Sequence, residues 1–351
     1  MAIKIPIQLP YGAVYFRKSN PPREDWERDY AQASRDGYNI FRHWFMWGTI
    51  ETSPGVYDWE DYDRQMELGE KYNIKAIIAE VTTCVPEWVF TQFPETLCEN
   101  TQGEKAKSEM SVSCAVGGFY EGICLDTPVG RELTGNFLKA LAKRYKGHPS
   151  LLGYDIWNEC NYSHDHCYCK DTRNKFRIWL QNKYKTLDAL KNAWHRYSLL
   201  SWNDVKPPPK LALHTECNDW LLFRKENAYD QMKWKVNILR QVDSDCLITA
   251  HGTAQSLENM AMGGSDEWMA AENVEVYGLT FVQSRKGNEG YKHWSALDLT
   301  RSGARGKRFW HSESQGGPLW YQPQVTGRPR EDGRITEPED IRQWNMTSLA
   351  G

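Results

Sequence analysis

The sequence lacks long apolar runs, an apolar leader and an excess of charge of either sign. None of its hydrophobic stretches approaches the ~18 residues that a membrane-spanning helix needs, so we expect no membrane partner. The 43 Lys and Arg residues nearly balance the 46 Asp and Glu residues. A nucleic-acid-binding protein usually carries a strong basic excess, so we expect no nucleic-acid partner. The opening stretch MAIKIPIQLPYG has no apolar signal core, which predicts a cytoplasmic protein.

Nucleotide-binding motifs and internal repeats are also missing. No G-x-G-x-x-G or G-x-x-x-x-G-K-[ST] pattern follows the first apolar run, which removes the usual nucleotide-binding open sheets. The 351 residues are enough for one large domain or two ordinary ones. We interpret residues 1–351 as a single domain.

Short apolar runs alternate with longer helical patterns about seven times along the chain. The expected strands are residues 7–16, 39–47, 75–81, 151–158, 246–250, 274–282 and 309–313. The expected helices are residues 22–36, 61–72, 131–146, 173–184, 187–197 and 219–242. This alternation predicts an α/β fold with a parallel sheet and helices outside it. Polar and aromatic residues gather where the strands end, which favours a TIM (β/α)8 barrel over an open sheet.

Aromatic residues make up 13% of the chain, and 16 of them are Trp. Large flat rings stack on the apolar faces of sugars, and their polar edges suit partly wet clefts. A tryptophan-rich core explains the same composition, and composition alone favours that explanation.

Two of the expected strands end in a glutamate. The segment GYDIWNEC runs into Glu159, and KRFWHSESQGGP runs into Glu313. Taken alone, each glutamate also has an ordinary structural explanation. Glu159 would cap the next helix, and Glu313 would be a loop residue in a glycine turn. Glu159 ends the fourth strand and Glu313 the seventh, so an eight-stranded barrel would set them across its mouth from each other. Retaining glycoside hydrolysis needs two such carboxyl groups roughly 5–5.5 Å apart, one as acid/base and one as nucleophile.

The chain resembles glycoside hydrolase family 42, the β-galactosidases of a large clan of retaining barrel glycosidases. The similar segments are FRHWFMWGTIETSPGVYDWEDYD, VTTCVPEWV, CLDTP, DIWNE, CYC with FRIWLQNKYKTLDALKNAW, NDWLLFRKENAYD and FWHSESQGGPLW. They extend over nearly the whole chain. The resemblance implies a retaining β-galactosidase that hydrolyses terminal β-D-galactosides by double displacement, with a small carbohydrate as its partner. Trimers occur in the family, so the resemblance is also compatible with a homo-oligomer.

The resemblance also implies roles for particular residues. Glu159 would be the acid/base and Glu313 the nucleophile. Asn158 would hydrogen-bond the sugar 2-hydroxyl, a contact that strengthens in the transition state. Arg42 would contact the sugar or orient the nucleophile, and Trp320 would form a wall of the sugar subsite. The alternatives are a structural ion pair for Arg42 and ordinary loop packing for Trp320.

Two departures from the family pattern leave other functions open. Phe281 stands at the substrate-binding position where the family has a Tyr. The stretch TEPEDIRQWNMTSLAG resembles the helix before the family's eighth strand, and the chain then stops. We therefore expect a barrel incomplete at its C-terminal end and without the family's downstream domains. The alternatives are another exo-β-glycosidase of the clan (arabinopyranosidase, fucosidase or glucosidase), a non-catalytic carbohydrate-binding barrel or inactive fragment, and a zinc-stabilised scaffold.

The nine cysteines are better explained as thiols or metal ligands than as a disulfide framework. Family members hold a structural zinc with four cysteines, and no cofactor is implied for catalysis. The candidate ligands here are Cys124, Cys160, Cys167 and Cys169. The family's last ligand position is Thr172, for which Cys160, His164 or His166 would substitute. The alternative is a set of free, partly buried thiols.

Overall fold

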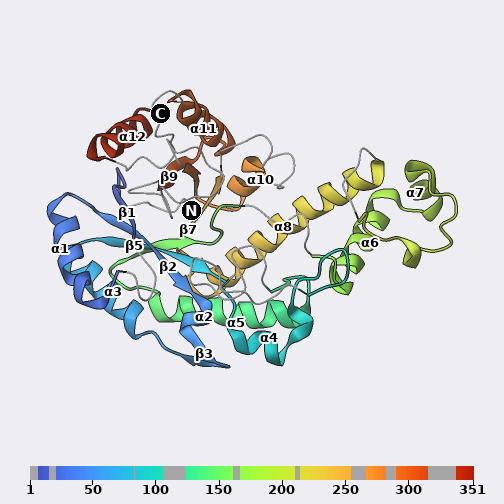
Figure 1. The fold of residues 1–351 in the computed structure, drawn as a ribbon, viewed down its shortest axis with the longest axis horizontal. Helices are drawn as coiled ribbons and strands as arrows, with labels where there is room; N and C mark the ends of the chain where they lie inside the picture. The colour runs from blue at the N-terminus through green and yellow to red at the C-terminus, as the bar shows by residue number, and fades with distance from the viewer. Residues whose placement is uncertain are drawn as a thin grey trace.

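The computed structural model describes residues 7–15, 21–82, 84–105, 123–160, 167–209, 214–253, 266–281, 290–314 and 337–351. Seven parallel strands form one sheet with the order β1-β2-β5-β6-β7-β8-β9 (Figure 1). These strands are β1 (Gly12–Tyr15), β2 (Ile40–Met46), β5 (Lys75–Val81), β6 (Leu151–Asp155), β7 (Leu247–Thr253), β8 (Val276–Phe281) and β9 (Arg308–Ser314). A small antiparallel hairpin of β3 (Glu51–Ser53) and β4 (Val56–Tyr57) lies outside this sheet.

Helices follow the strands of the sheet, and those other than α6 and α7 lie around the barrel (Figure 1). They are α1 (Trp26–Arg35), α2 (Trp47–Ile50), α3 (Glu60–Tyr72), α4 (Glu87–Gln92), α5 (Pro128–Tyr145), α6 (Lys170–Tyr184), α7 (Leu187–Trp194), α8 (Thr215–Val242), α10 (Glu267–Glu272), α11 (Gly290–Gly303) and α12 (Pro338–Ala350). Short 3-10 helices occupy Arg23–Asp25, Pro94–Thr96 and Trp202–Asp204. Neighbouring strands of this sheet pair in parallel, so each connection returns the chain to the same end of the barrel before the next strand begins. The predicted α/β barrel is confirmed, with seven strands in the part of the chain that the structure describes.

The sheet separates two apolar layers. On its outer face, Phe45, Ile78 and Tyr154 pack with Phe137 and Leu141 of α5 in the largest core cluster. Inside the barrel, a second cluster of Ile77, Leu247 and Val276, with Ile40, Leu152 and Trp310 against it, lies near the amino ends of the strands. The interior is therefore filled with apolar side chains at one end, which leaves the carboxyl ends for polar side chains.

The barrel is not hydrogen-bonded between β9 and β1 within the described residues. The guanidinium of Arg308, at the start of β9, donates a hydrogen bond of 2.9 Å to the carbonyl of Ile7, ahead of β1. On the same side, Ser348 Oγ of α12 lies 2.7 Å from His311 Nδ1 and 3.1 Å from His293 Nε2 of α11. The Arg308 hydrogen bond thus links the two ends of the open sheet, and the Ser348 contacts hold α11 and α12 against the outer face of β9.

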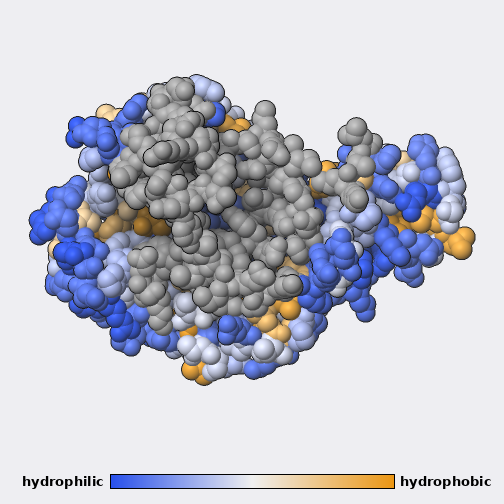
Figure 2. All heavy atoms as spheres, viewed as in Figure 1, coloured by the Kyte–Doolittle hydropathy of each residue, from blue (hydrophilic) through white to orange (hydrophobic). Residues whose placement is uncertain are grey.

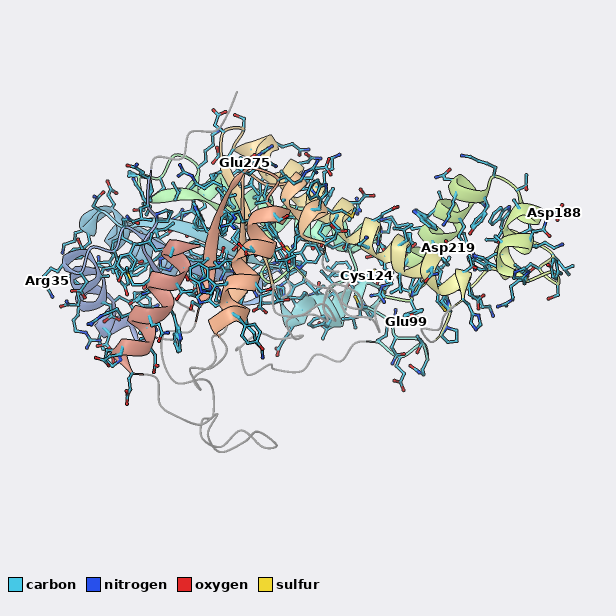
Figure 3. The ribbon with its side chains drawn as sticks, turned by 90° about the horizontal axis from the view of Figure 1, so that it is seen from above. Arg35, Glu99, Cys124, Asp188, Asp219 and Glu275 are labelled. Carbon is cyan, nitrogen blue, oxygen red and sulfur yellow. The ribbon has the colours of Figure 1, made fainter. Side chains whose placement is uncertain are left out.

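Helices α6, α7 and the first half of α8 form a lobe beside the barrel (Figure 1). Its core is aromatic, with Phe176, Trp194, Trp220 and Phe223 in one cluster. The buried carboxylate of Asp219 accepts hydrogen bonds from Lys183, Tyr184 and the Trp194 indole. Asp219 points into this core, whereas Asp188 lies at the lobe's far end (Figure 3). The tryptophan-rich core considered above thus explains part of the unusual composition.

The outer helices expose mainly hydrophilic atoms, and apolar patches remain at the far end of the lobe (Figure 2). Ion pairs such as Arg64 to Glu27 and Lys71 to Glu27 join α1 to α3 on this surface. Among the described residues, no helix is both long and apolar enough to cross a membrane.

Candidate active site

Arg42 of β2 joins three acceptors near the carboxyl ends of the strands. Its Nε donates to Asp155 Oδ2 at 2.7 Å, its Nη1 to Glu313 Oε2 at 3.1 Å and its Nη2 to Asn158 Oδ1 at 2.7 Å. Burial lowers the pKa of Arg42, but the carboxylates of Asp155, Glu313 and Glu159 outweigh this effect and raise it. The structure therefore brings Arg42, Asn158 and Glu313 together and places Glu159 within electrostatic range of them.

Asp155 and His251 are site residues that the sequence analysis missed. Burial raises the pKa of Asp155, but the Arg42 guanidinium and the His251 imidazole outweigh it and hold the pKa below its usual range. His251 Nδ1 lies 2.9 Å from Asp155 Oδ2. One feature of the sequence could have identified Asp155 as a site residue. It lies inside the apolar run LLGYDIW, where a buried carboxylate requires a partner.

Glu159 occupies a tight turn directly after β6. Its φ of 53° lies in the left-handed region, which costs a non-glycine residue roughly 1–3 kcal/mol. The Glu159 N–H donates to His251 Nε2 at 3.2 Å, and the Cys160 N–H donates to the His251 carbonyl at 2.7 Å. The histidine thus holds the turn from the neighbouring strand β7.

A register shift between β8 and β9 sets the direction of Glu313. Leu279 pairs with His311, but the next residue on β8, Thr280, pairs with Glu313. Strand β9 therefore carries one extra residue, Ser312, which forms a β-bulge. Because strand residues otherwise alternate between the two faces, the bulge changes the face on which every later side chain lies.

The bulge turns Glu313 into the barrel. His311 faces outward, since its ring contacts His293 of α11 and Ser348 of α12. Strict alternation would place Glu313, two residues later, on that same outer face. Instead Glu313 bonds to Arg42.

Gly278 provides the space for this bulge. A Cβ added at Gly278 would lie 1.9 Å from Ser312 Oγ, 3.0 Å from Ser312 Cβ and 3.0 Å from the Trp310 carbonyl. Real Cβ atoms do not approach other heavy atoms so closely. A side chain at position 278 therefore requires Ser312 and the adjoining backbone of β9 to shift.

Phe281 lies away from these residues. Its ring packs with Leu279 and Leu297 on the outer face and stacks on His293 of α11, with centroids 5.1 Å apart. This placement corrects the expectation that Phe281 lines the sugar site, because the alternation of β8 turns its side chain outward. Thr280, the inward neighbour, is buried and its hydroxyl has no hydrogen-bond partner among the described residues. Trp320, His164 and His166 lie outside the described residues.

The comparisons with known proteins identify the family. The profile of glycoside hydrolase family 42, described as β-galactosidase, matches residues 15–348. The chain belongs to glycoside hydrolase family 42. It is similar to β-galactosidase Bga of Halorubrum lacusprofundi (25% identity over 337 residues, 89% of this chain and 46% of the relative). It is also similar to β-galactosidase bgaB of Geobacillus kaustophilus (25% identity over 359 residues, 97% of this chain and 48% of the relative).

Solved structures of family 42 share the fold. The β-galactosidase of Rahnella sp. R3 superposes with a TM-score of 0.80 at 21% identity, covering 97% of this chain and 49% of that one. The β-galactosidase of the psychrophilic Marinomonas ef1 gives 0.77 at 22% identity, covering 97% and 52%. The chain thus spans about half the length of these family 42 relatives.

Four cysteines meet where the loops after β5 and β6 approach each other. The Sγ atoms of Cys98, Cys124 and Cys167 lie within 4.8 Å of one another, and Cys169 Sγ lies 3.6 Å from Cys124 Sγ. Hydrogen bonds from Cys124, Cys169 and Cys98 hold the pKa of Cys167 well below its usual range. Cys124 and the neighbouring Glu99, whose N–H donates to Cys167 Sγ, lie between the barrel and the lobe (Figure 3).

The composition of this cluster differs from the four cysteines that the resemblance to family 42 implied. Cys160 is not part of it, because its side chain is buried in the outer core of the barrel and its N–H is bonded to His251. Cys98 takes part instead. The sequence analysis missed Cys98 because it has no characteristic ligand spacing to the other cysteines.

We predict that Gly278→Ala displaces Glu313. Overpacking against Ser312 should lower the free energy of unfolding by about 1–3 kcal/mol. In the aryl β-galactoside hydrolysis proposed below, a misplacement near 1 Å should lower kcat about 10²-fold. Chemical denaturation and steady-state kinetics measure the two effects.

Gly290→Ala is the matched control, since a Cβ there meets no atom within 4 Å. Adding Ser312→Gly to Gly278→Ala should restore part of the lost kcat. Wild-type kcat in Gly278→Ala alone would contradict the role of the bulge.

Proposed function

We propose that residues 1–351 form one catalytic domain of a retaining β-galactosidase that acts on terminal β-D-galactosides. The observation that carries the proposal is the convergence of Glu313 and the Glu159 turn on Arg42, from the seventh and fourth strands of the sheet. Relatives that match most of this chain are named β-galactosidases, which supports the choice of sugar.

In the first step, the Glu313 carboxylate attacks the anomeric carbon and the bond to the leaving oxygen breaks. Glu159 gives its proton to that oxygen, so the aglycone leaves as a neutral alcohol. In the second step, the Glu159 carboxylate removes a proton from water, which displaces Glu313 from the anomeric carbon. The sugar is released with its original configuration and both side chains regain their starting states.

Arg42 and Asn158 prepare the site for this chemistry. The hydrogen bond from Arg42 Nη1 fixes Glu313 Oε2. Asn158 Oδ1 accepts from Arg42 Nη2, so the amide Nδ2 is left as the donor for a sugar hydroxyl. This arrangement supports the expected bond to the 2-hydroxyl, which gains strength as charge develops on the ring.

We predict that Glu313→Ala abolishes hydrolysis of an aryl β-galactoside, because no carboxylate remains to attack the anomeric carbon. Azide should restore turnover and yield the α-galactosyl azide, since the small anion enters the space of the lost side chain. NMR of the azide product determines its anomeric configuration. Arabinopyranoside, fucoside and glucoside analogues test the choice of sugar in parallel. Full activity without azide would exclude Glu313 as the nucleophile.

We predict that Glu159→Gln lowers kcat/KM about 10²–10⁴-fold for a galactoside with an alkyl leaving group. The loss should be far smaller for 2,4-dinitrophenyl β-galactoside, because that leaving group departs without protonation. Steady-state kinetics on both substrates measure the ratio. An equal loss on both would count against the acid/base role.

We further propose that Cys98, Cys124, Cys167 and Cys169 hold a structural zinc ion. Four thiolates at about 2.3 Å from a tetrahedral zinc stand about 3.8 Å apart. The Cys124 to Cys169 separation is 3.6 Å, and the sulfur atoms of Cys98, Cys124 and Cys167 lie within 4.8 Å of one another. The backbone N–H groups of Glu99, Cys169 and Thr172 point at the sulfur atoms and would stabilise their negative charge. Such an ion would tie the loop after β5 to the loop after β6 and take no part in the reaction.

We predict about one zinc per chain in metal analysis, a content that Cys98→Ser lowers severalfold because the ion loses one of its four thiolates. The same variant should lower the melting temperature, since metal binding adds to folding stability. Cys160→Ser is the control, because this cysteine lies outside the cluster, and it should leave the zinc content unchanged. Loss of zinc in Cys160→Ser but not in Cys98→Ser would overturn the assignment.

A further inference from the structure

Asp155 and His251 are buried side chains that join the segments carrying the two glutamates. We propose that Asp155 is a positioning residue for both carboxylates, and that His251, as the neutral tautomer protonated on Nδ1, extends its effect to Glu159. The inference rests on the proposed function, because it uses the roles assigned there to Glu159 and Glu313.

The first arm runs from Asp155 to the nucleophile. Asp155 Oδ2 accepts the Arg42 Nε hydrogen bond at 2.7 Å, and the same guanidinium reaches Glu313 through Nη1. The guanidinium is planar and rigid, so a bond at Nε fixes the direction in which Nη1 points. Asp155 thereby sets the position of the Glu313 carboxylate without touching it.

The second arm runs from Asp155 to the acid/base. His251 Nε2 receives the Glu159 backbone N–H, and an N–H can only donate. Nε2 must therefore present its lone pair, which places the single proton of the neutral ring on Nδ1. Nδ1 then donates to Asp155 Oδ2 at 2.9 Å. The carboxylate thus selects the tautomer that can accept the hydrogen bond from Glu159.

This hydrogen bond offsets the backbone strain at Glu159. The left-handed φ of 53° is unfavourable for a glutamate and persists only where the surroundings enforce it. The His251 ring and carbonyl bind two consecutive N–H groups, those of Glu159 and Cys160. Without the imidazole acceptor, the peptide before Glu159 would lose its partner, and the carboxyl group would leave the orientation needed for proton transfer.

Two substitutions distinguish the two hydrogen bonds of the His251 ring, the one to Asp155 and the one from the Glu159 N–H. His251→Asn keeps a donor near the Nδ1 position for Asp155 but removes the acceptor for the Glu159 N–H. His251→Gln places an amide oxygen near the Nε2 position and keeps that acceptor. His43 is the matched control, because it is also buried, lies on β2 and contacts Tyr30 instead of either glutamate.

We expect His251→Asn to behave like a weakened acid/base variant. Its kcat/KM on an alkyl β-galactoside should fall about tenfold more than on 2,4-dinitrophenyl β-galactoside, and azide should accelerate turnover and give the β-galactosyl azide. His251→Gln should recover most of the difference. His43→Asn should lower stability without changing the ratio between the substrates. Equal losses on both substrates in His251→Asn, without azide acceleration, would overturn the role of His251.

Asp155→Asn tests the shared origin of the two arms. It should lower kcat/KM on both galactosides, because the amide brings no negative charge to the two groups, Arg42 and His251, that share Asp155 Oδ2. An unchanged kcat/KM on the dinitrophenyl substrate would refute the first arm. Imidazole nitrogen NMR of the wild-type chain should show His251 protonated on Nδ1 alone. Protonation on Nε2 would refute the second arm whether or not the chain turns over a galactoside, whereas absence of wild-type turnover would count against the proposed function only.

Discussion

The site depends on one buried cation. Arg42 is almost fully enclosed, and an uncompensated buried guanidinium would cost several kcal/mol. Asp155, Asn158 and Glu313 provide the compensation through three different nitrogens. Strands β2, β6 and β9 are thereby tied together at the end of the barrel where the chemistry is proposed. Glu313 engages Arg42 through its oxygen Oε2.

The features that the sequence predicted well follow from periodicity and strand order. The apolar run KAIIAEV gives β5 over its predicted range, because a buried parallel strand reads as a continuous hydrophobic stretch. Glu159 and Glu313 were placed after the fourth and seventh strands by counting, and the sheet order confirms that count. Strand β1 is shorter than predicted, and β6 ends at Asp155 because the next residues form the turn that carries Glu159.

The details of the site could not be derived in this way, because they depend on contacts between distant residues. Asp155 and His251 are 96 positions apart, and only the pairing of β6 with β7 brings them together. The direction of Glu313 depends on one extra residue in β9, and the pattern His311-Ser312-Glu313 reads as simple alternation. The same alternation places Phe281 on the outer face and Thr280 on the inner face, whereas similarity to family 42 implied that Phe281 lines the sugar site.

The cysteine cluster differs from the set that the resemblance to family 42 implied. Thr172 stands at the family's last ligand position, and its hydroxyl donates to Asp126 Oδ2 at 2.7 Å. Asp126 also accepts hydrogen bonds from Lys175, Asn227 and Gln231, which fix the loop after Cys124 to α6 and α8. A neutral hydroxyl held in this network cannot replace a thiolate. Cys98 brings a fourth sulfur to the cluster from a different loop, while the hydroxyl of Thr172 serves the junction between barrel and lobe.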